Sequence, residues 1–178
     1  MNNKRLFLSI LVLVLGLYSQ SQVLSKNNDY PIQAVPFTAI EMDDTFWLPR
    51  INTVHKSTIP HLLDMCQDRI KSFRIAAGLE EGTYQTSLPF DDTDVYKTIE
   101  AISYSLYYNP DNNLEKVVDS IITIIGMAQE PDGYLYAART IGSYPEGFPV
   151  YWLGNNRWDQ VNDLSHELYN MGHLIEAG

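Results

Sequence analysis

The sequence predicts an all-α protein made of antiparallel helical hairpins, entered through a short extended segment at residues 35–40. Four separate segments carry apolar residues at intervals of three and four, the spacing that places side chains on one face of a helix. Proline, glycine, asparagine and aspartate, which are typical of turns, separate these segments. The link between the second and third segments is so short that these two helices should be antiparallel neighbours.

The first helix is expected to run from Pro49 or Ile51 to Ile70, after a turn at residues 42–47. Pro60 lies inside it and has no backbone N–H, so it should kink or interrupt the helix. The residues expected on the buried side are Ile51, Val54, Ile59, Leu62, Leu63, Cys66 and Ile70.

The chain has one cysteine, Cys66, so it cannot form an internal disulfide. Because Cys66 belongs to the apolar pattern of the first helix, we expect a buried small side chain and not a reactive thiol. His55 and His61 of the same segment are predicted to be surface or cap residues.

The second helix opens at Asp91, Asp92 and Thr93, three residue types that accept hydrogen bonds from free N–H groups at a helix start. Its apolar stripe consists of Val95, Ile99, Ile102 and Leu106. One interpretation is a capped core helix. The other is that Asp92, Asp94 and Tyr96 face a cleft, and the sequence leaves both open.

The third helix follows the break at residues 109–111, with Asn112 or Asn113 as its expected cap. Its apolar face should comprise Leu114, Val117, Val118, Ile121, Ile122 and Ile125. Pro131, Asp132 and Gly133 then predict a tight turn.

Residues 137–162 show no periodicity and predict a long loop, a feature that is often functional. The loop contains the aromatic residues Tyr144, Phe148, Tyr151, Trp152 and Trp158. Such rings suit the rim of a sugar site. They equally suit anchors that pin the loop onto the helices, and both interpretations stay open.

The last helix begins at Ser165 and carries His166 and His173 on one face, seven residues apart. Zinc proteases need two histidines four residues apart with a glutamate after the first; here Glu167 follows His166, but residue 170 is asparagine. A histidine at a helix start can instead point into a cleft, so His166 is a candidate functional residue.

The charge balance excludes one class of partner. The chain has 12 Lys and Arg against 22 Asp and Glu, a formal net charge of −10. Nucleic-acid binding needs clustered basic residues, so no nucleic-acid partner is expected.

Residues 1–22 predict a secretory signal peptide. Lys4 and Arg5 form a positive start, residues 6–17 are mostly apolar, and small and polar residues follow. The apolar run is shorter than the roughly 20 residues of a membrane span. We therefore expect a periplasmic or extracellular protein with no stable membrane anchor after cleavage, and a flexible linker at residues 23–35.

Three motifs together resemble the β-L-arabinofuranosidase-type enzymes of glycoside hydrolase family 127. They occupy residues 90–101, with Asp-Val-Tyr-Lys, residues 128–135, with Pro-Asp-Gly-Tyr-Leu, and residues 166–177, with His-Glu-Leu-Tyr and Gly-His-Leu-Ile-Glu-Ala. Trp47 and Arg50 are similar to the entry segment of that family.

The resemblance implies that residues 36–178 are the front portion of an (α/α)6 barrel catalytic domain, which β-sandwich domains follow. It implies a retaining exo-hydrolase that removes terminal L-arabinofuranose or a related sugar. In that family a zinc-bound cysteine is the nucleophile and a separate glutamate is the acid/base, and both lie in the later part of the domain. Cys66 matches none of those cysteines, so no catalytic residue or metal ligand is assigned here.

The resemblance does imply sugar-facing residues. His166 matches a helix-start histidine that contacts the innermost sugar, and Asp92, Asp94 and Tyr96 are further candidates. The expected partner is an L-arabinofuranose-type glycan, with no hydrolysis by these residues alone. The alternatives are a non-catalytic carbohydrate-binding or interaction module and a non-functional remnant.

Overall fold

The computed structural model describes residue 32 and residues 34–178, which fall into two compact units divided after Ile40. The predicted signal peptide, and all but three residues of the predicted linker, lie outside the described residues. The candidate site lies in the second unit.

The described part of the first unit contains one short element, the 3-10 helix η1 (Phe37–Ala39). The extended segment predicted at residues 35–40 is therefore wrong at its centre. Pro36 stands directly before η1 with φ −57° and ψ 134°, and its carbonyl accepts a hydrogen bond from the N–H of Ala39, which closes the turn.

The second unit, Glu41–Gly178, is helical throughout its regular structure. Its elements are α2 (Trp47–Thr53), the π-helical turn η2 (Val54–Thr58), α3 (Ile59–Met65), α4 (Gln67–Ala76), α5 (Asp92–Tyr108), α6 (Asn112–Ala128), α7 (Ala137–Ile141), the 3-10 helix η3 (Val150–Leu153) and α8 (Glu167–Ala177). No strand occurs among the described residues, which confirms the all-α prediction. None of the helices described is both long enough and apolar enough to cross a bilayer.

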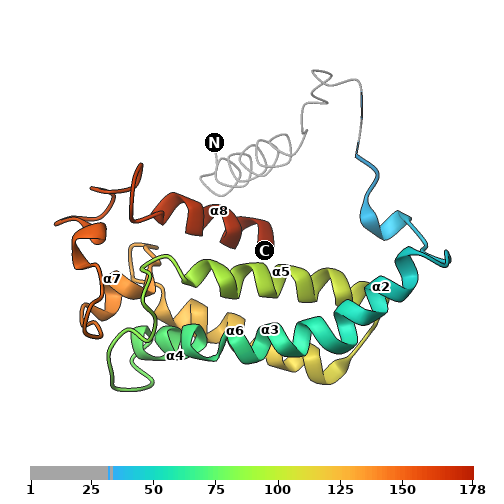
Figure 1. The fold of residues 1–178 in the computed structure, drawn as a ribbon, viewed down its shortest axis with the longest axis horizontal. Helices are drawn as coiled ribbons and strands as arrows, with labels where there is room; N and C mark the ends of the chain where they lie inside the picture. Colours follow the sequence, from blue (N-terminus) through green and yellow to red (C-terminus); the bar gives the residue numbers. More distant parts are fainter. Residues whose placement is uncertain (1–31, 33) are drawn as a thin grey trace, which may run out of the picture. The chain divides into compact units, whose positions relative to one another are not determined.

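Helix α5 is the centre of the unit. It lies between α8 on one side and a layer formed by α3, α4 and α6 on the other (Figure 1). α5 and α6 run in opposite directions, as the short connection predicted (Figure 1). This arrangement brings the start of α8 next to the start of α5.

The predicted first helix is divided into four pieces. The N–H of Ile59 bonds to the carbonyl of Val54, five residues back, directly before Pro60. Proline lacks an N–H and its ring displaces the carbonyl four residues earlier, so the helix widens locally into a π turn. A second break at Cys66 separates α3 from α4, and the helix continues to Ala76, beyond the predicted end.

The core forms on one face of each long helix. On α5, Val95, Ile99 and Ile102 are at most 4% exposed, as predicted. On α6, the predicted burial is confirmed for Val118, Ile121 and Ile125. It is wrong for Val117 and Ile122, which lie outside the stripe that packs on α4 and α5 and remain 44% and 49% exposed.

The helix starts differ from expectation in a specific way. Asp111 caps α6, one residue before the predicted positions, and its carboxylate accepts hydrogen bonds from the N–H groups of Asn113 and Leu114. Asp91 occupies the cap position of α5 but makes no capping hydrogen bond. Its carboxylate lies 3.6 Å from the guanidinium of Arg69 instead.

The turn predicted after α6 is confirmed. The N–H of Gly133 bonds to the carbonyl of Glu130, and Gly133 has φ +89°, a conformation that favours glycine. Asp132 supports the turn by accepting a hydrogen bond from the N–H of Tyr134 at 3.1 Å.

Candidate functional site

The starts of α5 and α8 lie side by side, and side chains join them. The ring of His166 meets the ring of Phe90 edge-on, with centroids 4.5 Å apart. One turn further along, the Thr93 hydroxyl donates a hydrogen bond to the side-chain oxygen of the buried Asn170. His166 is therefore held beside the helix start that the motif at residues 90–101 forms.

Other rings extend this contact into an aromatic row of four side chains: Trp152, Phe90, His166 and Tyr169. Trp152 stacks on Phe90 with an interplanar angle of 8°. Tyr169 lies 6.1 Å from His166 on the other side and accepts a hydrogen bond from the ammonium of Lys97 at 2.8 Å. None of the four is fully buried. The row thus offers apolar ring faces, an imidazole and a cation on one partly open surface, a combination that suits a sugar.

The loop before α8 supplies one member of this row, and two of its other rings pack as anchors. Phe148 is buried between Tyr84 and Tyr144, and Trp158 packs edge-on against Tyr134. Of the two interpretations of the loop aromatics, anchoring describes these two rings. Trp152 belongs to the row.

Asp92 points into the protein interior. Its side chain is 1% exposed, and one carboxylate oxygen accepts a hydrogen bond from the N–H of Ala137 at 2.8 Å. The other oxygen is buried without a hydrogen-bond partner. Burial, reinforced by the nearby charge of Asp91, raises the pKa of Asp92 to about 7.

Tyr96 and Asp94 lie apart from the aromatic row. Tyr96 is 1% exposed and packs against Phe73, and burial, with the charge of Asp92 adding to it, raises the pKa of its phenol. Asp94 is exposed and pairs with Arg69 at 3.1 Å, in a pocket that Cys66 also lines. A sugar-binding role for Asp92, Asp94 and Tyr96 stays a prediction, whereas Phe90, Trp152 and Tyr169 enter as new candidates. Phe90 and Tyr169 stand inside the quoted motifs, which is the signal that could have found them.

The burial predicted for Cys66 is confirmed, since it is 4% exposed. Its thiol lies 3.4 Å from the hydroxyl of Thr98, and burial raises its pKa. A zinc-bound nucleophile needs a thiolate and further ligands. Cys66 is a neutral core residue and the chain has no second cysteine, so these residues do not fit the zinc site that the resemblance implies.

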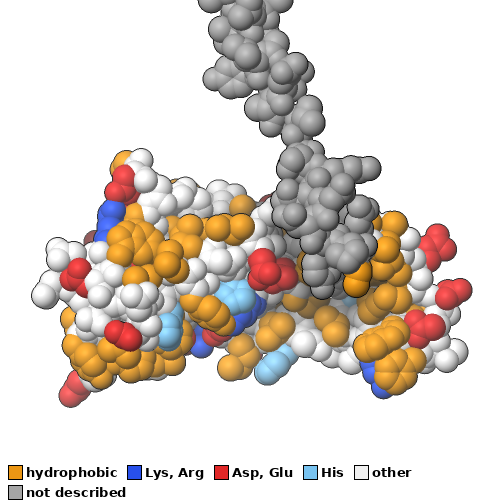
Figure 2. Space-filling view, turned by 90° about the horizontal axis from the view of Figure 1, so that it is seen from above, with side chains coloured by type: hydrophobic (Ala, Val, Ile, Leu, Met, Phe, Trp, Pro, Cys, Tyr) orange, Lys and Arg blue, Asp and Glu red, His pale blue; other side chains and the backbone are white. Residues whose placement is uncertain are grey.

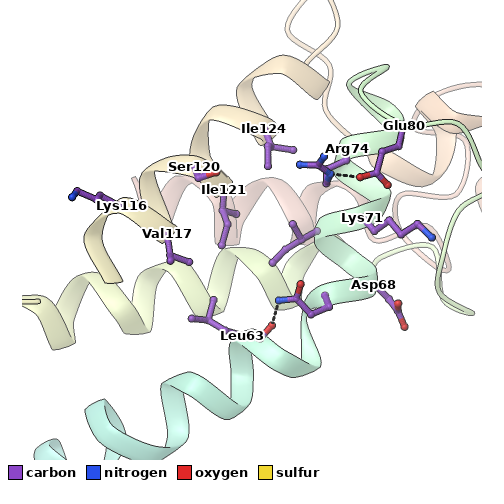
Figure 3. Close-up of a pocket in the computed structure, with 12 residues that line it drawn as sticks. Leu63, Asp68, Lys71, Arg74, Glu80, Lys116, Val117, Ser120, Ile121 and Ile124 are labelled. Atoms are coloured by element: carbon purple, nitrogen blue, oxygen red, sulfur yellow. Dashed lines mark hydrogen bonds and ion pairs between the residues drawn. The ribbon is translucent and has the colours of Figure 1, made fainter. Parts of the chain in front are cut away.

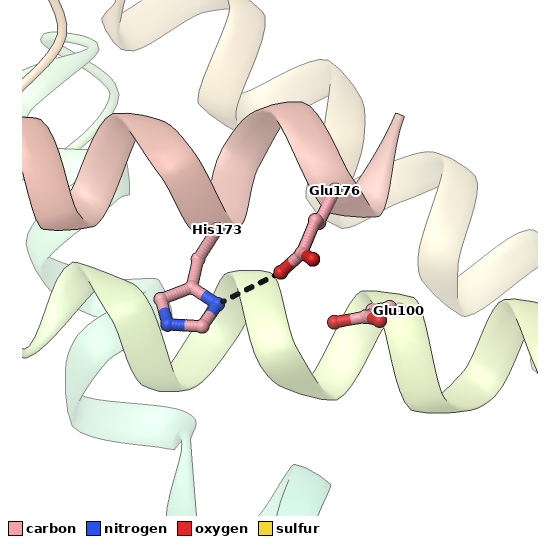
Figure 4. Close-up of side chains that lie close together, drawn as sticks. All are labelled: Glu100, His173 and Glu176. Carbon is pink, nitrogen blue, oxygen red and sulfur yellow. Dashed lines mark ion pairs between the residues drawn. The ribbon is translucent and has the colours of Figure 1, made fainter. Parts of the chain in front are cut away.

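One other group of side chains in the described part of the chain has donor atoms near enough to share an ion: Glu100, His173 and Glu176, within 4.8 Å of one another (Figure 4). The Nδ1 atom of His173 lies 3.7 Å from Glu176, whose side chain is 69% exposed. Imidazole and carboxylate are ligand types for zinc. Exposed acidic groups commonly cluster without an ion, so we assign no metal to them.

A groove of about 760 Å³ lies between α6 and the α3–α4 segment (Figure 3). Apolar side chains from both sides line it, among them Leu63, Val117 and Ile121. The ion pair between Arg74 and Glu80 closes one end. None of the predicted site residues lines this groove.

The face that α8 presents is different in character. In the space-filling view, apolar side chains are spread over it, and histidine side chains lie between them (Figure 2). Leu168, Tyr169 and Ile175 of α8 are 62%, 49% and 73% exposed. The aromatic row therefore lies next to an open apolar helix surface.

Comparison with known proteins gives the family. The pattern described as "Beta-L-arabinofuranosidase, GH127 catalytic domain" matches residues 39–178. Solved structures of family 127 enzymes share the helical fold over the matched part of their chains. The chain belongs to glycoside hydrolase family 127.

Individual relatives agree. The chain is 29% identical over 159 residues to a non-reducing end β-L-arabinofuranosidase of Bifidobacterium longum subsp. longum. It superposes on a solved family 127 β-arabinofuranosidase with a TM-score of 0.73 at 46% identity, over 83% of this chain. A family 127 β-L-arabinofuranosidase from Geobacillus stearothermophilus T6 gives a TM-score of 0.67 at 38% identity, over 77% of this chain.

These matches span a small part of each relative. The alignments use 78% of this chain but 23% of the Bifidobacterium protein, and 23% and 21% of the two solved chains. What the relatives do as whole proteins is therefore a matter for proposal.

Proposed function

We propose that this chain forms part of the sugar-binding wall of a β-L-arabinofuranosidase-type catalytic domain, with His166 facing the sugar. The observation that carries the proposal is the contact of His166 with Phe90, in which the motif at the start of α8 meets the motif at the start of α5. The family membership supports the substrate class, an L-arabinofuranose-containing glycan.

The chemistry of the wall is recognition. Ring faces in the aromatic row can pack against the C–H face of a sugar, while the His166 imidazole and the Lys97 ammonium can bond to its hydroxyls. Cys66, the one cysteine of the chain, is a buried core residue. The nucleophile and the acid/base are therefore proposed to belong to the later part of the family's catalytic domain, as the resemblance implies. In this proposal the catalytic domain is retaining and uses a zinc-bound cysteine, as the resemblance implies.

The binding test uses the chain and an oligosaccharide that ends in β-L-arabinofuranose. We expect saturable binding by calorimetry that His166→Ala weakens at least about tenfold, which corresponds to about 1.4 kcal/mol. His61→Ala, a change at an exposed position of α3, is the matched control and should bind like the wild type. Binding that His166→Ala leaves unchanged would refute the role of His166.

A hydrolysis assay separates this function from a complete enzyme. The chain should release no arabinose from the same oligosaccharide, because it lacks the nucleophile. Release of arabinose at a rate that Cys66→Ala leaves unchanged would show that other residues of the chain catalyse hydrolysis. It would overturn the proposal that this chain only binds the sugar.

Export is part of the same proposal. Residues 1–22 should direct a fused reporter across the inner membrane, and replacing Lys4 and Arg5 with glutamate should retain it in the cytoplasm. A reporter that stays in the cytoplasm with the unaltered segment would contradict export.

A further inference from the structure

Glu167, the residue after His166, has an unusual position for a carboxylate. It is 2% exposed, and three groups donate hydrogen bonds to it. The donors are the phenol of Tyr134 at 2.5 Å, the hydroxyl of Ser165 at 2.8 Å and the backbone N–H of Trp158 at 3.0 Å. A buried carboxylate needs such donors to offset its lost hydration.

The backbone around Glu167 is strained at two points. Among the described residues other than glycine, two have positive φ: Trp158 at +71° and His166 at +54°. A side chain in this conformation costs about 1–2 kcal/mol. Such conformations persist where the surrounding contacts over-determine them, and they concentrate at functional sites.

The same carboxylate adjoins both strained residues. The N–H of Trp158 points at it, and His166 lies between Ser165, which donates to it, and Glu167 itself. Tyr136 adds a second tie by donating from its phenol to the carbonyl of Ser165 at 2.5 Å. The chain on either side of His166 is thus fixed by buried hydrogen bonds.

We propose that Glu167 is a positioning residue for the sugar site, which holds the loop at Trp158 and the left-handed backbone of His166 so that the imidazole stays against Phe90. This inference rests on the proposed function, in which His166 faces the sugar. Glu167 does not touch the sugar in this proposal and acts through His166.

The charge of Glu167 matters for a geometric reason. An ionised carboxylate only accepts hydrogen bonds, so it can serve three donors together. A glutamine at this position would turn its NH2 group toward either the Trp158 N–H or the Tyr134 phenol, and one bond would be lost or reversed. Glu167→Gln therefore removes part of the tie while it keeps the size of the side chain.

The test compares Glu167→Gln with Glu176→Gln, a matched change at an exposed carboxylate of the same helix. In NMR spectra of the labelled chain, Glu167→Gln should shift the Trp158 amide proton upfield and move the His166 Cα and Cβ resonances away from left-handed values. Affinity for the arabinofuranosyl oligosaccharide should fall about tenfold, equivalent to about 1.4 kcal/mol. Glu176→Gln should change neither readout. If Glu167→Gln does not fold, Tyr134→Phe removes one donor and should show the same changes in smaller measure.

The outcomes separate the two proposals. Unchanged Trp158 and His166 resonances in Glu167→Gln would overturn the positioning role, as would altered resonances with unchanged affinity. If the resonances move but the wild type itself binds no sugar, the proposed function fails and Glu167 is a loop tie outside any sugar site. Moved resonances with weakened binding, matched by weakened binding in His166→Ala, would support both.

Discussion

The carboxylate of Asp92 accepts a hydrogen bond from the backbone N–H of Ala137, 2.8 Å away, and ties the first turn of α5 to the start of α7. This bond satisfies one oxygen of a fully buried acid and leaves the other without a partner. Burial favours the neutral form, which is why the pKa of Asp92 rises to about 7 from an ordinary value of 3.8.

Asp92 should make the stability of the fold depend on pH. Because the folded state binds this proton more tightly than the unfolded state, the contribution of Asp92 is greatest below pH 3.8 and is lost as the pH rises to about 7. The free energy of unfolding should fall by up to about 1.4 kcal/mol per pH unit in that window. Asp92→Asn, which cannot ionise, should lose this slope.

Urea unfolding of the wild type and of Asp92→Asn at several pH values measures this pH dependence. Asp91 also titrates in the folded protein, but it is present in both proteins and so does not affect the comparison. The variant should gain stability relative to the wild type as the pH rises from about 4 to about 7. Parallel stability curves for the two proteins would show that Asp92 is ionised in the fold across that window.

The hydrogen bond between Thr93 and Asn170 should couple α5 to α8. Both residues are buried, so Thr93→Val and Asn170→Ala should each destabilise by about 1–3 kcal/mol, since each leaves a buried polar group unpaired. The double variant should cost less than the sum. Thr123→Val, which removes a hydroxyl bonded within its own exposed helix face, is the control and should cost little. Strict additivity of the two core changes would contradict the coupling.

Two of the three motifs that resemble the family have a local structure that was predictable, because they obey local rules. The stripe of α5 follows from the spacing of Val95, Ile99 and Ile102, and the turn at Gly133 from Pro-Asp-Gly. Pro60 predicted an interruption of the first helix, but it did not predict the form of that interruption. A π turn is one of several ways to accommodate a proline, and packing selects among them.

The site itself was less predictable, because its contacts join residues far apart in the sequence. His166 was a candidate from its position at a helix start, yet Phe90 and Trp152 become its neighbours only through the packing of α8 and the loop on α5. From the sequence alone, Asp92 is a residue type that suits either a helix cap or a cleft. Only the fold shows that its partner is Ala137, 45 residues away.

The burial of Cys66 predicts low reactivity. The thiolate is the reactive form, and burial raises the pKa of this thiol while it also blocks access. In the folded chain, alkylation by a maleimide at neutral pH should be at least about a hundredfold slower than in the urea-unfolded chain. Mass spectrometry of timed samples measures both rates. Equal rates would mean that the region around Cys66 opens readily, and that it is not part of a stable core.

Two glycines of the long loop provide a matched pair for testing how tightly the loop is held. Gly154 has φ +70° and ψ −179°, a conformation essentially restricted to glycine, and a Cβ there would lie 2.6 Å from the Cβ of Asp159. Gly147 has φ +80°, but a Cβ there would meet nothing within 4 Å.

Gly147→Ala should therefore cost about 1–2 kcal/mol, the penalty for the left-handed backbone. Gly154→Ala should cost at least about 3 kcal/mol, because the clash adds to the strain. Asp159 would have to move, and with it the hydrogen bond that its carboxylate accepts from the N–H of Asn156 at 2.7 Å. Chemical denaturation of the two variants measures both costs, and equal values would indicate that residues 154–159 are free to rearrange.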